Sequence, residues 1–298
     1  MSIRVNPNIL PDLLAGLNQT RQQLNQADLE LASGRSINAP SDNPSGTVAL
    51  ILNHSAQSQT DTYQTNINDL QSKLQIADAS LNSAVSVINQ AITLGTEAGN
   101  SDLSNGDRQA IAQQLSGIQQ QLVGIANSTS GGTYLFGGTL VETQPFTINP
   151  LAPAGVTYNG NSSVTSVQIA DGQSVSVNVP GDQLFLNPSG NLLGSINQLI
   201  TAVQTNSGIS TAVTALGQAS SEFDTQRLGY GTALNQLQST GSFLASEQLQ
   251  LSTQETNLDG ADIAKVATQF SQAQVAYTSL LNAEAKVLNL PNILSFLQ

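Results

Sequence analysis

The sequence predicts a mainly α-helical protein with a small β insertion, in which the two chain ends together form an elongated helical rod. Three observations predict this fold class. Both ends of the chain carry apolar residues spaced three and four apart, and a long stripe of the same spacing lies within residues 44–98. Within residues 131–190, instead, Gly and Pro become frequent, and Val and Ile begin to alternate with polar residues. Spacings of three and four fall on one face of an α-helix, whereas alternation is typical of a β-strand.

The stripes at the two ends repeat every seven residues. At the N-terminal end, Asn6-Pro7 is a typical helix start, Ser33-Gly34 is a typical stop, and the stripe consists of Leu10, Leu17, Leu24 and Leu31. The C-terminal stripe runs through Phe223, Tyr230, Leu237, Leu244, Leu251 and Leu258, and then through Ile263, Val266, Phe270, Ala273, Tyr277, Leu280 and Val287. Each apolar face must be buried on another helix, so the two ends are expected to lie side by side.

The segments between the ends begin with two more predicted helices. Asn43-Pro44 starts the first of them, which is expected to reach about residue 98. Its unbroken stripe consists of Tyr63, Ile67, Leu70, Leu74, Ala77, Leu81, Ala84, Ile88 and Ala91. Such a helix is about 80 Å long at 1.5 Å per residue, so the rod depends on its continuity near His54. Ser104 and Asp107 have the spacing of a capping box, which predicts a third helix with Ile111, Leu115, Ile118, Leu122 and Ile125 on its apolar face.

The β insertion is predicted from a change of period. Val167 and Ile169 alternate with polar residues, Asp171-Gly172 follows, and Val175, Val177 and Val179 alternate again. Alternation on both sides of an Asp-Gly pair indicates a β-hairpin. After Asn187-Pro188 the helical period returns, which predicts one long helix and then a terminal helix, separated by a break at Asp259-Gly260-Ala261-Asp262.

Composition excludes several classes of function. The chain has 20 Asp and Glu against 8 Lys and Arg, so clustered cations for nucleic acid or a polybasic membrane anchor are not expected. It has no cysteine, and only 9% of its residues are charged. No stretch has the length of a membrane-spanning helix, and the first residues lack the apolar core of a cleaved signal. These features fit a cytoplasmic protein, although an export route without a cleaved signal leaves the same trace.

No catalytic, cofactor-binding or metal site is predicted. His54 is the only histidine and has no recognisable catalytic partner in the sequence, so a structural histidine is expected. Gly131-Gly132 and Gly137-Gly138 lack the Gly-Lys-Ser/Thr of a phosphate loop and fit turns. Asp42 fits a turn residue, and the segment at Asp259 lacks the rest of a calcium-binding loop.

The terminal helices have few apolar residues whose burial could offset the conformational entropy that is lost when these helices fold. Each buried leucine contributes roughly 1.5–3 kcal/mol, against about 1–2 kcal/mol of backbone entropy for every ordered residue. We therefore expect neighbouring subunits to complete these helices. The alternative is that one monomer satisfies both stripes by itself, as in an ordinary helical bundle.

Four segments of the sequence resemble the flagellin superfamily, and within it the branch that joins the flagellar hook to the filament. They are residues 33–44 (SGRSINAPSDNP), residues 107–112 (DRQAIA), residues 134–146 with YLFGGT and ETQPF, and residues 181–185 (GDQLF). Together with the helices between them, the resemblance covers residues 1–146 and 181–298.

The resemblance implies a fold like that of phase 1 flagellin, divided into three parts. These are a terminal coiled coil of residues 1–38 and 261–298, a helical rod of residues 39–140 and 187–260, and a β domain of residues 141–186. The implied contact residues for assembly are Leu10, Leu17, Leu24, Phe270, Tyr277, Leu281 and Leu288.

The resemblance also implies partners and a location. The subunit would leave the cell through the flagellar type III export channel and assemble into a ring between hook-associated protein 1 and the flagellin filament. The family's export chaperone would bind the C-terminal helices, at about residues 260–298. No cofactor, nucleic acid or membrane partner is implied.

Three other functions are weighed against this one. The chain could be flagellin itself, although residues 134–146 favour the junction branch. It could be a secreted helical adhesin or carbohydrate-binding module, although the insertion carries few aromatic residues for a sugar platform, namely Phe146, Tyr158 and Phe185. An enzyme is the least supported class, because no set of residues in the sequence has the spacing of an active site.

Overall fold

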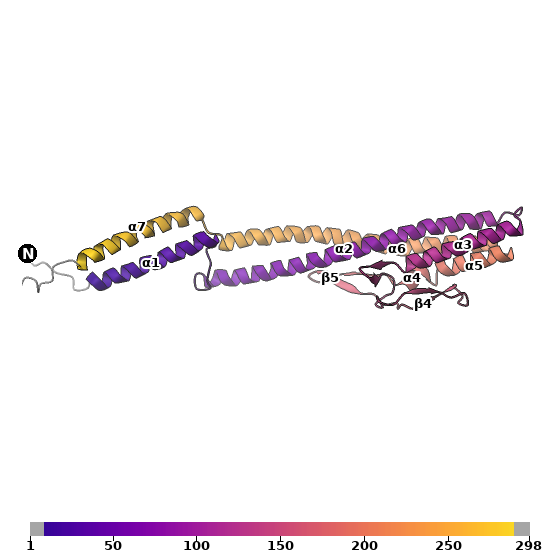
Figure 1. Ribbon diagram of the computed structural model, residues 1–298, viewed down its shortest axis with the longest axis horizontal. Coiled ribbons are helices and arrows are strands. Elements are labelled where there is room, and N and C mark those ends of the chain that lie inside the picture. Colours follow the sequence, from indigo (N-terminus) through magenta and orange to yellow (C-terminus); the bar gives the residue numbers. More distant parts are fainter. Residues whose placement is uncertain (1–8, 289–298) are drawn as a thin grey trace, which may run out of the picture. The chain divides into compact units, whose positions relative to one another are not determined.

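The computed structural model describes residues 9–288, with the side chains of residues 11–287. This part of the chain folds as two compact units, the first from residues up to 59 and from 248 onward, the second from residues 60–247. The helices of the described residues are α1 (Ile9–Ser33), α2 (Pro44–Ala98), α3 (Asn105–Ala126), α4 (Gly181–Phe185), α5 (Leu192–Thr205), α6 (Ile209–Asp259) and α7 (Ile263–Leu288) (Figure 1). The predicted fold class, mainly helical with a small β part in the middle of the chain, is confirmed.

Six short strands form three separate antiparallel pairs in the second unit. The pairs are β1 (Thr129–Ser130) with β2 (Thr133–Tyr134), β3 (Phe146–Ile148) with β4 (Val156–Tyr158), and β5 (Ser166–Ala170) with β6 (Gln173–Ser176). The last pair is the predicted hairpin, and Gly172 takes φ +67 in its turn. The pairing shifts register between Gln168 and Ala170, and β6 ends at Ser176, so Val177 and Val179 lie beyond the strand.

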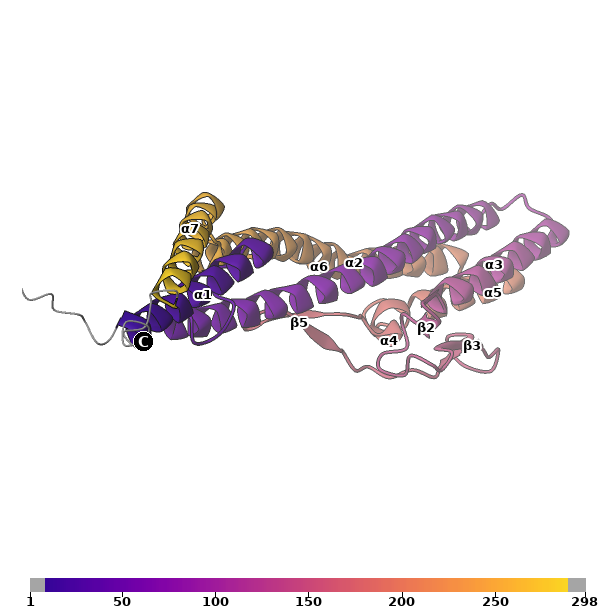
Figure 2. The same cartoon turned by 60° about the vertical axis from the view of Figure 1, so that its left-hand side comes forward.

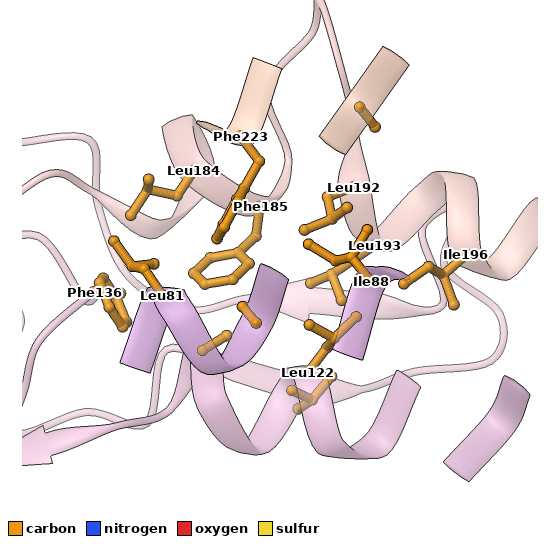
Figure 3. Packing of buried hydrophobic residues seen from close by; sticks show 14 of the residues in the cluster. Leu81, Ile88, Leu122, Phe136, Leu184, Phe185, Leu192, Leu193, Ile196 and Phe223 are labelled. Carbon is orange, nitrogen blue, oxygen red and sulfur yellow. The ribbon is translucent and has the colours of Figure 1, made fainter. Parts of the chain in front are cut away.

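The core of the second unit is built on the long stripe of α2. Leu81, Ala84, Ile88 and Ala91 are fully buried, and α3 and α5 pack side by side against this region. Figure 3 shows Leu81 and Ile88 of α2 facing side chains from α3, α4 and α5. The spacing read from the sequence therefore identifies the buried face of α2.

An aromatic cluster joins the strands to the helices of this unit. Phe185 of α4 lies 5.6 Å from Phe136, 5.5 Å from Phe146 and 5.5 Å from Phe223 of α6, measured between ring centroids. All four rings are buried, and the contacts of Phe185 with Phe136 and Phe146 are edge-to-face. Figures 1 and 2 show α4 and the strands lying together beside α3 and α5. The β segment thus shares one continuous core with the helices.

Helix ends follow the predicted signals with one exception. Ser104 and Asp107 form the predicted capping box at the start of α3, and their hydrogen bonds hold the pKa of the Asp107 carboxyl below its ordinary value. The helix predicted after Asn187-Pro188 is not one helix, because α5 ends at Thr205 and the next residue, Asn206, takes the left-handed conformation with φ 53. Asn tolerates this conformation and closes the end of α5, and α6 then starts at Ile209.

The helix that begins at Pro44 is continuous past His54, as the rod expectation required. Its Asn43 accepts the backbone N–H of Gly46 at 3.0 Å and thereby caps it. The predicted start at Asn6-Pro7 lies outside the described residues. The three-part division into residues 1–38 with 261–298, 39–140 with 187–260, and 141–186 stays a prediction.

Replacing Phe185 with alanine should lower the stability of the second unit by about 3–5 kcal/mol, because the change leaves a cavity among three other buried rings. Phe243→Ala is the matched control, since Phe243 of α6 is 63% exposed and its loss should change stability by less than about 0.5 kcal/mol. Urea unfolding followed by circular dichroism measures both effects. Equal destabilisation by the two variants would contradict the role given to the aromatic cluster.

Candidate assembly surface

Helices α1 and α7 of the first unit pack side by side as an antiparallel pair (Figure 1). At one end of the pair Leu280 lies next to Gly16, and at the other end the carbonyl of Gly34 accepts the N–H of Ala261 at 3.0 Å. The apolar residues buried between the two helices are Ala27, Val266 and Ala273, and Thr20 is buried with them. The expectation that the two ends of the chain lie side by side is confirmed.

The predicted contact residues lie along this pair but are only partly covered. Leu17 and Leu24 of α1 and Phe270 and Tyr277 of α7 are half-buried, and Leu281 is 39% exposed. The side chains of Leu10 and Leu288 lie outside the described residues. The role of these seven positions in assembly stays a prediction.

The pair leaves considerable apolar surface exposed. The buried side chains between the helices are small, whereas Leu14 and Leu29 of α1 and Ile263 and Val275 of α7 are each exposed. Since apolar surface gains roughly 25 cal/mol per Å² when water is removed from it, these positions favour contact with another protein surface.

A second exposed apolar face lies on the first turns of α2. Val48, Ile51 and Leu52 are spaced three and four apart and are 59%, 62% and 66% exposed. This face precedes the stripe that begins at Tyr63, and the predictions from the sequence do not include it. The signal was available in the spacing of these three residues, which puts them on one side of the helix.

The two linkers of the first unit are fastened to each other around one buried carboxylate. Asp259, which is 3% exposed, forms an ion pair with Arg35 and accepts the backbone N–H of Ile37 at 2.8 Å. Its carbonyl accepts the N–H of Ser36 at 2.6 Å, and Arg35 forms an isolated β-bridge with Gly260. We call residues 34–37 with 259–261 the linker clasp.

The linker clasp shows what sequence analysis missed at Asp259. The segment was predicted as a helix break, and that prediction is confirmed because α6 ends at Asp259 and α7 begins at Ile263. The pairing with Arg35 was not predicted, since it joins positions 224 residues apart in the chain. The available signals were Asp259-Gly260 at one helix break and Gly34-Arg35 at the other.

Polar side chains connect α2 and α6 within the same unit. Asn53 donates to the carbonyl of Leu251 at 3.1 Å, His54 Nε2 lies 2.9 Å from Glu255 Oε1, and Gln57 donates to Glu255 Oε2 at 2.9 Å. The hydrogen bond from Gln57, and then that with His54, lowers the pKa of the Glu255 carboxyl below its ordinary value. His54 is thus a helix-connecting residue, in agreement with its predicted structural role.

A groove with a volume of about 740 Å³ runs along one side of the α1–α7 pair. Ala27, Ala273, Ala276 and Glu30 are among the residues that line it. Six amide side chains line it, namely Gln19, Gln22, Gln23, Gln26, Gln269 and Gln272. We call this feature the glutamine groove.

The remaining candidate positions have structural roles. Asp42 Oδ2 accepts the backbone N–H groups of Asn38 and Ala39, as expected of a turn residue. Gly131 and Gly132 have positive φ in the turn between β1 and β2.

Among the described residues, His, Asp and Glu side chains nowhere gather in a group able to hold a metal ion. Within residues 9–288, no helix has both the length and the apolar character needed to cross a bilayer.

Comparison with known families identifies both helical ends of the chain. Residues 8–140 match the bacterial flagellin N-terminal helical region, and residues 213–297 match the bacterial flagellin C-terminal helical region. The two matches include α1, α2, α3, α7 and most of α6.

Comparison with individual proteins gives similar results. The chain is 25% identical over 252 residues to flagellar hook-associated protein 3 of Salmonella typhimurium, covering 80% of this chain and 78% of the relative. It is 24% identical over 289 residues to flagellar hook-associated protein 3 of Escherichia coli, covering 88% and 90%. The crystal structure of Xanthomonas campestris FlgL has the same fold, with a TM-score of 0.58 at 18% identity, over 68% of this chain and 98% of that one.

Asp259→Asn should weaken the linker clasp, because the variant keeps the size of the side chain but leaves the Arg35 guanidinium without its carboxylate. We expect faster hydrogen exchange at the amides of Ser36 and Ile37 and a loss of about 1–3 kcal/mol in the stability of the first unit. Asp78→Asn is the control, since it removes the Arg227–Asp78 ion pair of the second unit, where both side chains are partly exposed. Unchanged exchange at Ser36 and Ile37 would show that the carboxylate does not hold the clasp.

Gln57→Ala should raise the pKa of Glu255 toward its ordinary value, because Gln57 supplies the largest lowering contribution. The folded-state pKa lies below the unfolded one, so this stabilisation is present above the unfolded pKa and is lost as pH falls through the folded pKa. His54→Ala should shift the pKa in the same direction by less, and Gln254→Ala on the same helix should leave it unchanged. Titration of the carboxyl ¹³C resonance measures all three, and an unshifted pKa in Gln57→Ala would refute the assignment.

Proposed function

The chain belongs to the flagellin family, and from this premise we propose that it is a structural subunit of the bacterial flagellum at the hook–filament junction, equivalent to hook-associated protein 3. The observation that carries the proposal is the match to two proteins of that name over 78% and 90% of their lengths. The α1–α7 pair, with its incompletely covered apolar stripe, supplies a physical basis for assembly.

The subunit acts by joining surfaces, without catalysis. Leu17, Leu24, Phe270, Tyr277 and Leu281 are the described contact positions, and Leu10 and Leu288 continue the same stripes. Neighbouring copies cover the apolar surface that the α1–α7 pair leaves exposed. Because that surface is recovered only in the assembly, the hydrophobic effect favours the ring over the free subunit.

Its partners differ on the two sides of the junction. Hook-associated protein 1 lies on the hook side and the flagellin filament on the other, so the subunit adapts one helical lattice to another. The exposed apolar face of Val48, Ile51 and Leu52 is a further candidate for such contacts.

The subunit reaches this location by type III export and functions outside the cell. An export chaperone binds the C-terminal helices at residues 260–298 before export and covers the apolar stripe of α7. The β segment at residues 141–186 faces outward in the assembly, and no cofactor takes part.

The alternative function is that of the filament subunit itself, because the two matching family regions are those of flagellin. The residues of the segment 134–146 favour the junction subunit. A helical adhesin is less supported, since the three aromatic residues of the β segment are engaged elsewhere. Phe146 and Phe185 are buried in the core, and the Tyr158 hydroxyl donates to the carbonyl of Phe136 at 3.0 Å.

Immunogold labelling with an antibody against residues 141–186 separates these functions. A junction subunit gives one band at the base of each filament, because the ring holds few copies. Label along the whole filament would identify a flagellin, and label on cells without flagella would indicate an adhesin.

The double variant Leu24→Asp with Tyr277→Asp should abolish filament assembly on cells that lack their own junction protein, because it places two charges in the apolar stripe. We expect at least a tenfold loss of filamented cells, counted by electron microscopy, since burying unpaired charges costs several kcal/mol. Leu151→Asp is the control, because Leu151 is 96% exposed. Normal filament numbers in the double variant would disprove the contact role of the stripe.

A further inference from the structure

The break between α6 and α7 is short, and its sequence is compatible with a helix. Residues 260–262 separate the two helices, and no proline occurs between residues 189 and 290. Ala261 is a strong helix former, and glycine and aspartate weaken a helix without forbidding it. The break between α1 and α2 differs, because Pro40 interrupts it. Of the two breaks that the linker clasp joins, only the one after α6 allows its helix to continue.

The linker clasp replaces the hydrogen bonds that a continuous helix would form at this break. In an α-helix each carbonyl accepts the N–H of the residue four positions later. Here the carbonyl of Asp259 accepts the N–H of Ser36 at 2.6 Å instead of that of Ile263. The N–H of Ala261 likewise donates to the carbonyl of Gly34 at 3.0 Å instead of to the carbonyl four residues earlier. The clasp and a continuous helix therefore compete for the same backbone groups.

Other features of the break are unfavourable in its present conformation. A Cβ atom on Gly260 would overlap the backbone carbonyl oxygen of Thr256, so this conformation requires glycine, whereas a regular helix accepts any residue except proline. The N–H groups of Asp262 and Ile263 have no hydrogen-bond partner among the described residues, whereas a continuous helix would satisfy both. The contacts of the clasp offset these losses.

We propose that the linker clasp is a conformational lock on the break between α6 and α7. With the clasp closed, residues 260–262 are not helical and α7 begins at Ile263 as a separate helix. With the clasp open, residues 260–262 become helical and α6 continues into α7. The ion pair between Arg35 and Asp259 selects the closed state, and the side chain of Arg35 is 46% exposed, so it is accessible from solvent.

Opening the lock changes the direction in which the apolar stripe of α7 faces. Leu258 belongs to the stripe of α6, and Val266 belongs to that of α7. At about 100° per residue, a continuous helix would place Val266 about 80° around the helix axis from Leu258. A contact that draws Arg35 away from Asp259 would therefore rotate the stripe of α7 relative to that of α6. This inference does not depend on the proposed function, because it concerns the free chain.

Hydrogen exchange followed by NMR on the full-length protein distinguishes the two states, because each state protects different amides. The closed clasp protects Ser36 and Ile37, whereas a helical break protects Asp262 and Ile263. Arg35→Gln removes the ion pair from a position outside α6 and α7, so it cannot act through their helix propensity. We expect exchange on the order of tenfold faster at the first two amides and on the order of tenfold slower at the other two.

Arg21→Gln is the matched control, because it removes the same charge from an exposed position of α1 outside the clasp. It should leave all four amides unchanged. Faster exchange at all four amides in Arg35→Gln would overturn the proposal, because it would show that the break frays when the clasp opens. Unchanged exchange at Asp262 and Ile263 in that variant would overturn it as well.

Two substitutions within the break test the same equilibrium in opposite directions. Gly260→Ala introduces the overlap with Thr256 and favours a helix, so the ¹³Cα chemical shifts of residues 260–262 should move to helical values even with Arg35 in place. Ile263→Pro should preserve the break, because proline fits the first position of α7 and cannot continue α6.

The double variant Arg35→Gln with Ile263→Pro completes the test. Its ¹³Cα shifts at residues 260–262 should stay non-helical, although the ion pair of the clasp is absent. Non-helical shifts in Gly260→Ala, or helical shifts in the double variant, would overturn the proposal. Arg35→Gln alone decides the question if Gly260→Ala does not fold, as verified by circular dichroism.

Discussion

The antiparallel packing of α1 on α7 brings together helices from opposite ends of the sequence, and the other parts of the first unit depend on it. Each helix has an apolar stripe whose exposure to water is unfavourable, and each helix covers part of the stripe of the other. The linkers must therefore meet where α1 ends and α7 begins. There Asp259 receives hydrogen bonds and an ion pair from the opposite linker, so a buried carboxylate holds the two linkers together.

The two units bury their apolar helical stripes to different extents. In the second unit, α2, α3, α5 and α6 enclose one core together with four phenylalanine rings, and the stripe of α2 is fully buried from Leu81 to Ala91. In the first unit, a single pair of helices covers each stripe only in part, and the buried positions are small residues such as Ala27 and Ala273. A self-sufficient core and an incompletely covered pair thus occur in one chain, which suits a subunit that must fold alone and then assemble.

The low charge of the chain has a corresponding role. A surface of glutamine, serine and threonine can move from water into a protein contact when its amides and hydroxyls find partners, whereas isolated charges pay a larger desolvation cost. The glutamine groove concentrates this chemistry on one side of the terminal pair.

The sequence by itself determined the features that depend on neighbouring residues. Heptad spacing predicted the stripes of α1 and α7, the three-four spacing predicted the unbroken α2, and local signals identified the capping box at Ser104 and the turn at Asp171-Gly172. The family resemblance was likewise carried by short segments, one of which, residues 134–146, contributes both Phe136 and Phe146 to the core.

Only the tertiary structure decided the features that join distant residues. Neither Arg35 nor Asp259 has a local pattern that reveals the other, and the six glutamines of the groove come together only when α1 and α7 pack in one register. The division into α5 and α6 was also decided there, since the left-handed conformation of Asn206 interrupts a helical period that continues in the sequence on both sides. Periodicity specifies which face of a helix is buried, but the identity of the covering partner depends on contacts that span the whole chain.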